Sequence, residues 1–460
     1  MMFFKKAIIL FAILVLAGFA YWYFEIKKAK EKVETEESEA YLFEQTDNEI
    51  AKITLKEEGQ SPIVIEKKLE EKEEADEEEW IILSPVETPG ETIAIKSVIN
   101  VLKESKREEV VWENLDKKGE YGLETPEFSL EFSYKNEDEV YVIDFGIENL
   151  DNSKVFTAVS GKNAIFSVPV GLRDSLRKSL FDLRDKRISP YSSDDIEKIS
   201  LLSLVETFIL MKEDDEWYFM PDKIKASKMR VDMYTGNLRW GGFAEVVEEK
   251  GMELVKYGLD KPRLLLNFKI KDNKDFMFIL GDPITENTTD FYYAMRSSDS
   301  MIFQVKSDLV SRLLTTQFEL KDRSIFSINS EDIDTVTLEK EGNRYTFARH
   351  DDEWVFSDTG EKLERGYKID NIVRSITAAE YEERDPIKKG ESGYSETGIE
   401  DSKYLVAFTF ADKRPGLIVR LTEKDEQTNK LWLTPDDGST VYHTSGYFVS
   451  NFPDKREDLL

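Results

Sequence analysis

One short motif recurs at a fixed interval along this chain of 460 residues. Asp214-Asp215-Glu216-Trp217 and Asp351-Asp352-Glu353-Trp354 are identical and lie 137 residues apart, and Glu77-Glu78-Glu79-Trp80 lies another 137 residues upstream. This interval predicts three tandem copies of one module, because solenoid repeats are much shorter, about 20 to 50 residues. Shared architecture then explains the recurrent tryptophans and carboxylates before any of them needs to be interpreted as an active site.

Other landmarks return with nearly the same interval and support the repeat. We predict modules at 41–190, 191–326 and 327–460, each within the usual size of a single domain that encloses its own core. The matching segments are Tyr121 to Pro126 with Tyr257 to Pro262, Ile165-Phe166 with Ile302-Phe303, Phe181 to Ile188 with Phe318 to Ile325, and the strands Ile53 to Leu55, Ile199 to Leu201 and Val336 to Leu338.

The first copy contains one insertion, because the distance from Ile53 to Ile199 is nine residues longer than that from Ile199 to Val336. The extra residues fall in Glu70 to Glu79, a run with eight acidic residues and one lysine. A segment this charged cannot bury apolar area, so we predict a solvated loop that extends a hairpin. A cation-binding or partner-binding acidic finger is the alternative.

Period-two alternation dominates each copy and predicts antiparallel strands. In the third copy, Ile333 to Leu338, Tyr345 to Arg349 and a strand that begins at Trp354 form a predicted meander, and the tryptophan covers one end of the core. In the first copy, Ile95, Val98, Ile99 and Leu102 share one face of a predicted helix. The module is therefore predicted to be α+β, with a mostly antiparallel sheet and packed helices.

A structural corner and a closing helix complete the predicted module. Gly122 is expected to end a helix in the left-handed conformation, and Pro126 prevents the helix from resuming. Two hairpins follow, which in the second copy comprise Arg263 to Gly281 and Phe291 to Val305. A single closing helix is predicted at Ser307 to Asp322, with Leu309, Leu313 and Leu314 on one stripe.

The N-terminal segment has the pattern of a membrane anchor. After a short tail, 1–6, the residues from Ala7 to Phe24 form an uncharged run of 18, long enough to span a bilayer, with Tyr21-Trp22-Tyr23 at the interface. A cleaved signal peptide is the alternative, because Gly18-Phe19-Ala20 weakly resembles a cleavage site. We predict an uncleaved, single-pass anchor in the inner or cytoplasmic membrane, a charged stalk at 25–40, and residues 25–460 outside the cytoplasm.

The overall charge and the absence of cysteine exclude several classes of function. A net charge of -30 argues against nucleic-acid binding and against a body that lies flat on anionic lipid. With no cysteine there is no disulfide, thiol nucleophile or thiolate metal site.

Catalytic motifs are equally scarce. The two histidines, His350 and His443, occupy unrelated places in the third copy, and zinc or histidine-based catalysis is not expected of them. The Asp-Asp-Glu-Trp turns are interpreted as solvated rather than as calcium sites, since the ligand spacing of a calcium loop is absent. We therefore predict no enzymatic activity, no catalytic, cofactor-binding or metal-ligating residue, and no cofactor; ligand-binding residues stay unassigned.

These motifs together resemble a bacterial family of uncharacterised function. They are the tryptophan strand, the amphipathic helix, Tyr-Gly-Leu-x-x-Pro, the glycine-ended strands at Asp144-Phe145-Gly146 and Leu280-Gly281-Asp282, and the Leu-Arg-Asp-Lys-Arg segment. The resemblance covers most of 41–326 and weakens in the third copy, where Thr397-Gly398-Ile399 replaces Tyr-Gly-Leu.

Members of that family are typically membrane-anchored, carry the modules in tandem, and are often encoded beside gliding-motility-type ABC transporter components. The resemblance therefore implies a non-catalytic accessory or scaffold subunit of an ABC-type transport or motility complex, with permease or auxiliary subunits as partners. An envelope protein that binds a ligand or polysaccharide is the alternative. A carboxylate hydrolase would require two opposed acids at a definite separation.

Overall fold

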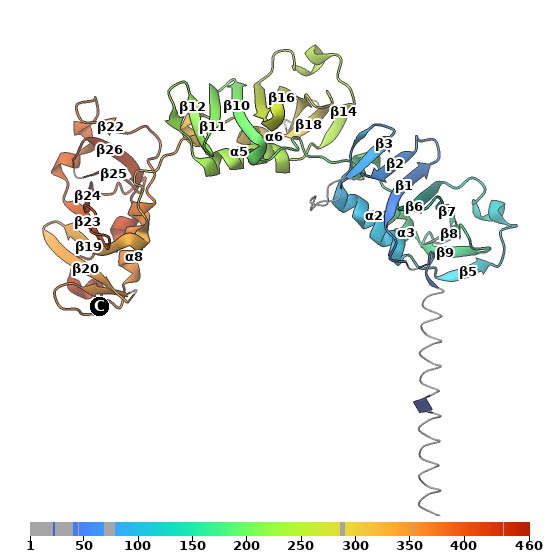
Figure 1. Cartoon of the computed structure of the whole chain (residues 1–460), viewed down its shortest axis with the longest axis horizontal. Helices are drawn as coiled ribbons and strands as arrows, with labels where there is room; N and C mark the ends of the chain where they lie inside the picture. The colour runs from blue at the N-terminus through green and yellow to red at the C-terminus, as the bar shows by residue number, and fades with distance from the viewer. Residues whose placement is uncertain are drawn as a thin grey trace, which may run out of the picture. The chain divides into compact units, whose positions relative to one another are not determined.

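The computed structural model describes residues 22–23, 40–44, 46–68, 79–285, 290–351, 353–435 and 437–460 (Figure 1). The predicted anchor at 7–24, apart from Trp22 and Tyr23, lies outside these residues, as do most of the stalk and the acidic loop up to residue 78. In the part of the chain that is described, no helix combines the length and the apolar character needed to cross a membrane.

Three antiparallel sheets form the framework of the described chain, and all three follow one plan. The order is β4-β3-β2-β1-β6-β7-β8-β9-β5 in the first sheet and β13-β12-β11-β10-β15-β16-β17-β18-β14 in the second. The third sheet, β21-β20-β19-β23-β24-β25-β26-β22, lacks only the short outermost strand among its described residues. The predicted α+β class and the tandem modules are therefore confirmed.

In each sheet the predicted meander pairs, through its first strand, with the hairpin strands that come later in the chain. The first sheet consists of β1 (Ile50–Glu57), β2 (Ile63–Lys67), β3 (Trp80–Ser84), β4 (Thr88–Pro89), β5 (Glu109–Trp112), β6 (Phe128–Tyr134), β7 (Tyr141–Glu148), β8 (Lys154–Val159) and β9 (Ile165–Pro169). The second consists of β10 (Ile196–Ser203), β11 (Thr207–Glu213), β12 (Glu216–Met220), β13 (Ile224–Lys225), β14 (Glu245–Glu248), β15 (Leu264–Ile270), β16 (Lys274–Pro283), β17 (Phe291–Arg296) and β18 (Ile302–Lys306). The third consists of β19 (Ile333–Lys340), β20 (Asn343–His350), β21 (Glu353–Phe356), β22 (Ile387–Lys388), β23 (Tyr404–Phe410), β24 (Leu417–Leu421), β25 (Lys430–Pro435) and β26 (Thr440–Ser445).

Residue contacts divide the chain into two compact units, 1–207 with 234–315 and 208–233 with 316–460. The border between these units passes through the second module, so the sheets are the clearer guide to the repeat.

A helix follows each meander and packs its apolar face on the sheet. These helices are α2 (Thr92–Glu104), α5 (Lys228–Trp240) and α8 (Tyr367–Thr377). In α2 the buried residues are Ile95, Val98 and Leu102, which join the core formed by the strands, as predicted from their spacing.

The repeated tryptophans belong to the core. Trp80, Trp217 and Trp354 are 4%, 0% and 3% exposed, and each begins or lies within the third strand of its meander. Before Trp217, Asp214 and Asp215 have φ values of 48° and 66°, which places both in the left-handed region that tight hairpin turns require. The interpretation of the acidic motif as a turn that leads into a core tryptophan is confirmed for this copy.

The corner glycines have the predicted conformation but end a different element. Gly122, Gly258 and Gly398 have φ values of 70°, 66° and 70°, and each caps a short 3-10 helix rather than the amphipathic helix. These 3-10 helices are η1 (Lys118–Tyr121), η3 (Leu254–Tyr257) and η6 (Ser395–Thr397). A strand that the sequence did not predict, β5, β14 or β22, lies between the amphipathic helix and the corner.

The prediction of one closing helix at Ser307 to Asp322 was wrong. The segment contains α6 (Ser307–Leu313) and α7 (Gln317–Leu320), and the first module has the equivalent pair α3 (Val170–Leu176) and α4 (Leu180–Leu183). The chain restarts at Thr316, which is extended and whose side chain accepts a hydrogen bond from the backbone of Glu319. A capping box of this kind favours a new helix start over a continuous helix.

Candidate functional site: a polar basin in the third module

The third module contains an open cavity of about 650 Å³, which we call the basin. Its size falls within the range of about 300–1,000 Å³ that is usual for small-molecule sites. The lining residues come from the corner, from the end of β24, from β25 and β26, and from the segment that follows α8. They are Glu383, Arg384, Thr397, Gly398, Asp401, Ser402, Lys403, Thr422, Glu423, Lys424, Asp425, Thr428, Lys430, Leu431, Trp432 and His443.

Trp432 occupies a position that is aromatic in all three modules. In the paired strands, Phe156 lies opposite Ser167, Tyr293 opposite Gln304, and Trp432 opposite His443. Phe156, Tyr293 and Trp432 also each belong to the small apolar cluster next to the corner of their own module.

The residue that covers this ring differs in the third module. In the first two modules a corner tyrosine packs edge-on against it, with ring centroids 4.8 Å apart for Tyr121 and Phe156 and 4.9 Å apart for Tyr257 and Tyr293. The residue before the corner glycine is Thr397 in the third module, and it lines the basin together with Trp432. A threonine is much smaller than a tyrosine and can cover less of the ring, and Trp432, which is partly buried, lines the basin.

A second substitution keeps the corner away from the sheet. A Cβ atom built on Gly146 would lie 2.0 Å from the backbone oxygen of Tyr121, and one on Gly281 would lie 2.1 Å from that of Tyr257. Gly281 directly follows the residue that pairs with the first residue of β15. In the third module Thr422 directly follows the residue that pairs with the first residue of β23, so Thr422 takes the equivalent position. The corner therefore cannot approach β24 as closely as it approaches the glycine in the other modules.

A charged group forms one rim of the basin. Lys430 donates to Glu383 and forms a second ion pair of 3.2 Å with Glu382. The hydrogen bond from Lys430 lowers the pKa of Glu383, which adopts a left-handed backbone with φ of 68° although it is not glycine. Non-glycine residues in this conformation cost energy and occur often at binding sites.

His443 lies beneath this rim and stays uncharged near neutral pH. Its side chain is 14% exposed, and burial lowers its pKa while the nearby Glu383 opposes the shift. Nδ1 lies 3.3 Å from Oε2 of Glu383, at an orientation that forms no hydrogen bond. The imidazole packs against Trp432 with ring centroids 4.8 Å apart, and the guanidinium of Arg384 lies 5.6 Å from the indole centroid on the rim.

The remaining polar groups of the basin offer donors and acceptors in similar numbers. Among the described residues, Arg384, Lys403 and Lys424 form no ion pair, and neither do the carboxylates of Asp401 and Glu423. This mixture suits a ligand that both donates and accepts hydrogen bonds better than a ligand of one charge.

The other histidine and the acidic turns contribute nothing to the basin. His350 is 76% exposed and lies 3.3 Å from Asp351 in the turn before β21. Asp215 pairs with Lys228 and with Lys212, and the hydrogen bond from Lys228 lowers its pKa. In the described part of the chain, no three histidine or carboxylate side chains gather in a way that could hold a metal ion.

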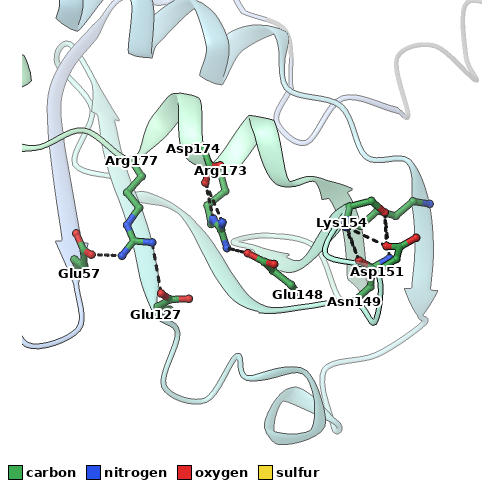
Figure 2. Close-up of polar contacts among 10 residues, drawn as sticks. Glu57, Glu127, Glu148, Asn149, Asp151, Lys154, Arg173, Asp174 and Arg177 are labelled. Carbon is green, nitrogen blue, oxygen red and sulfur yellow. Dashed lines mark hydrogen bonds and ion pairs between the residues drawn. The ribbon is translucent and has the colours of Figure 1, made fainter.

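A second polar cluster lies in the first module, between α3 and the sheet (Figure 2). Arg173 is 7% exposed and pairs with Glu148 at 2.8 Å and with Asp174 at 2.9 Å. One turn later, Arg177 pairs with Glu57 and, at 3.5 Å, with Glu127. The two arginines connect one helix to three different strands or strand ends, and we interpret the cluster as a set of ion pairs that holds α3 on the sheet.

The basin could not be predicted from the sequence, because its residues are far apart in the chain and have no motif of their own. The loss of tyrosine at Thr397 was visible as a divergence of the third copy. An alignment of Phe156, Tyr293 and Trp432 requires the strand pairing, since the spacing between Tyr293 and Trp432 is two residues longer than the repeat.

The architecture defines a class of protein with tandem α+β modules, each an antiparallel sheet with helices packed on it. A model of the family described as "Domain of unknown function (DUF4340)" matches residues 80–235 and 220–389, which together make up more than half of the chain. The protein belongs to this family. No curated protein and no solved structure matches it significantly.

Each family match starts near the end of one meander and continues into the next module. The unit that the family model recognises is therefore offset from the unit that forms one sheet.

Proposed function

We propose that the protein is a non-catalytic accessory or scaffold subunit of an ABC-type transport or motility complex. In this proposal residues 7–24 anchor it in the inner or cytoplasmic membrane, and residues 25–460 lie outside the cytoplasm. The kind of partner comes from the family resemblance given above. The observation that carries a partner-binding role is an exposed apolar stripe on helix α5.

The stripe consists of Met229, Met233 and Trp240, which are 64%, 67% and 79% exposed. Their spacing of four and seven residues places them on one face of α5, with Gly236 between the last two. The opposite face of α5 is buried, and its core side consists of Val231, Tyr234 and Leu238. A helix that is apolar on two faces is typical of one that is covered on both sides.

The other modules supply an internal comparison, because the same helix face is exposed in each. In α2 the equivalent residues are Ile93, Ser97, Asn100 and Glu104, and in α8 they are Tyr367, Asn371, Arg374 and Ala378. The fold thus tolerates polar residues on this face, and the apolar stripe of α5 needs another explanation. Methionine and tryptophan are enriched in protein interfaces, where they fill pockets of a partner.

The test is a pull-down of the tagged full-length chain from solubilised membranes of its own organism. We expect the wild type to recover ABC permease or auxiliary subunits. A variant with Met233→Ser and Trp240→Glu, the residues of the first module, is expected to recover at least fivefold less. Tyr367→Ser on the equivalent face of α8 is the matched control, since Tyr367 is 58% exposed, and it is expected to behave as wild type.

Two results would count against the scaffold role: a clean preparation without such partners, or equal recovery by the wild type and the double variant. Circular dichroism and the melting temperature of each variant separate loss of the partner from loss of the fold.

The basin favours a second function, the binding of an envelope ligand or polysaccharide. A cavity of about 650 Å³ with an aromatic ring and several polar groups is a suitable small-molecule site. A screen of cell-wall glycans against the purified chain tests this function, and the absence of measurable binding to any of them would refute it.

A further inference from the structure

The first two modules show what kind of group packs against the aromatic ring that is equivalent to Trp432. In the first two modules a tyrosine and the equivalent ring meet edge to face, at interplanar angles of 68° and 63°. Edge contact directs C–H groups at the face of an aromatic ring, which carries partial negative charge. The third module has Trp432 at this position and Thr397 in place of the tyrosine, so an occupant from outside would contact the indole in the same way.

The polar rim limits the chemistry of that occupant. An aromatic side chain would fill the space of the lost tyrosine but would make no hydrogen bond with Arg384, Lys403 or Asp401, which line the basin. A ligand with C–H groups on one face and hydroxyl groups around its edge satisfies both the ring and the rim.

The charges of the rim also argue against an anionic ligand. Four carboxylates line the basin, those of Glu383, Asp401, Glu423 and Asp425, and they oppose four cations, those of Arg384, Lys403, Lys424 and Lys430. Lys430 is already held by Glu382 and Glu383, and so has little capacity left for a phosphate or a second carboxylate. The neutral His443 adds a polar group without adding charge.

We propose that the basin binds a neutral saccharide, with one sugar ring against the face of Trp432 beside Thr397. The hydroxyl groups of the sugar then bond to Asp401, Lys403 and Arg384 on the rim. This inference rests on the ligand-binding function proposed above and specifies its ligand. It assigns Thr397 and Thr422 the role of keeping the site open, because in the other two modules a tyrosine packs on the equivalent ring and a glycine lets the corner approach the sheet.

The test is isothermal titration calorimetry on the full-length chain, purified in a detergent without a sugar headgroup. The probes are cellotetraose and chitotetraose as neutral saccharides, tetragalacturonate as an acidic one, and inorganic phosphate. We expect a neutral tetrasaccharide to bind at least tenfold more tightly than the acidic probe, and phosphate not to compete with it.

Three variants locate the site. Thr397→Tyr restores the residue of the other modules and is expected to weaken binding at least tenfold while the melting temperature stays the same or rises. Glu396→Gln is the matched control, because Glu396 is exposed in the same 3-10 helix and does not line the basin, and its binding is expected within threefold of wild type. Trp432→Ala is expected to abolish binding, and its melting temperature shows whether the module still folds.

The outcomes separate the ligand class from the function. Tighter binding of tetragalacturonate or phosphate would overturn the neutral class but keep a ligand-binding function. Failure of both neutral probes at millimolar concentration would overturn the inference, and failure of every probe, together with an empty glycan screen, would overturn the function as well. Neutral saccharide binding that Thr397→Tyr leaves unchanged would show that the site is not the basin.

Discussion

Removal of the corner tyrosine from the second module should reproduce the change that distinguishes the third. Tyr257 is 2% exposed, its ring contacts Tyr293, and its hydroxyl group donates to Glu248. Truncation of a buried aromatic side chain costs about 3–5 kcal/mol, of which the edge contact contributes about 0.5–1.5 kcal/mol. Threonine retains more of the side chain than alanine, so Tyr257→Thr is expected to destabilise the second module by about 3 kcal/mol.

Hydrogen exchange measures this effect in the second module alone, whereas global unfolding of a chain with several modules is not a two-state process. Peptides that cover 264–283 report on β15 and β16. Because about 1.4 kcal/mol corresponds to a factor of ten, exchange there should accelerate by about two orders of magnitude. Val255→Thr in the same 3-10 helix is the control, since Val255 is 76% exposed and its replacement is expected to change stability by less than about 0.5 kcal/mol.

An acceleration of less than threefold in Tyr257→Thr would refute this reasoning. It would mean that the ring pair does not hold the corner on the sheet, and that the loss of tyrosine at Thr397 cannot explain the basin.

Three further substitutions test other parts of the structure. Gly281→Ala should destabilise the second module by about 1–3 kcal/mol in the same exchange assay, because its Cβ would lie 2.1 Å from a backbone oxygen of the corner; unchanged exchange would contradict the close approach. His443→Gln, which introduces the residue found at Gln304, should reduce the loss of stability between pH 7 and pH 5. Burial lowers the histidine pKa, so the unfolded chain takes up a proton below about pH 6.5 before the folded chain does. Identical pH profiles of exchange protection in β25 and β26, corrected for the intrinsic exchange rate, would argue against this. Arg173→Met should destabilise the first module by about 1–2 kcal/mol in the same exchange assay, read on peptides from β7, which is less than for a fully buried pair because Glu148 is 30% exposed. Unchanged exchange would show that the cluster does not hold α3 on the sheet.

The repeat made most of the fold predictable, because each copy served as a check on the other two. The strands, the core tryptophans and the left-handed corner glycines follow from alternation and from turn chemistry, which are local properties of the sequence. The edge strands β5, β14 and β22 were missed because a run of four residues or fewer has too short a pattern to be recognised. The break between α6 and α7 was missed because the leucine stripe continues across it, and the capping box at Thr316 is the signal that would have revealed it.

The basin was not predictable in the same way. Trp432, Thr397 and Thr422 come from three separate segments. The loss of tyrosine at Thr397 is visible in the repeat, but only the strand register shows that Trp432 replaces another ring and Thr422 a glycine of the other copies. A change in a repeat is informative only after its structural position is known. The polar rim adds no signal, because charged residues are abundant throughout the chain.

The offset between the family unit and the sheet has a practical consequence for anyone who expresses parts of this protein. In the first sheet β1 lies between β2 and β6, so a fragment that begins at residue 80 loses two interior strands and leaves the backbone groups of β6 unpaired. Long unpaired edges of this kind recruit other chains into aggregates. Fragments cut at 191 or 327 would keep whole sheets, whereas fragments cut at the limits of the family match would precipitate for reasons unrelated to function.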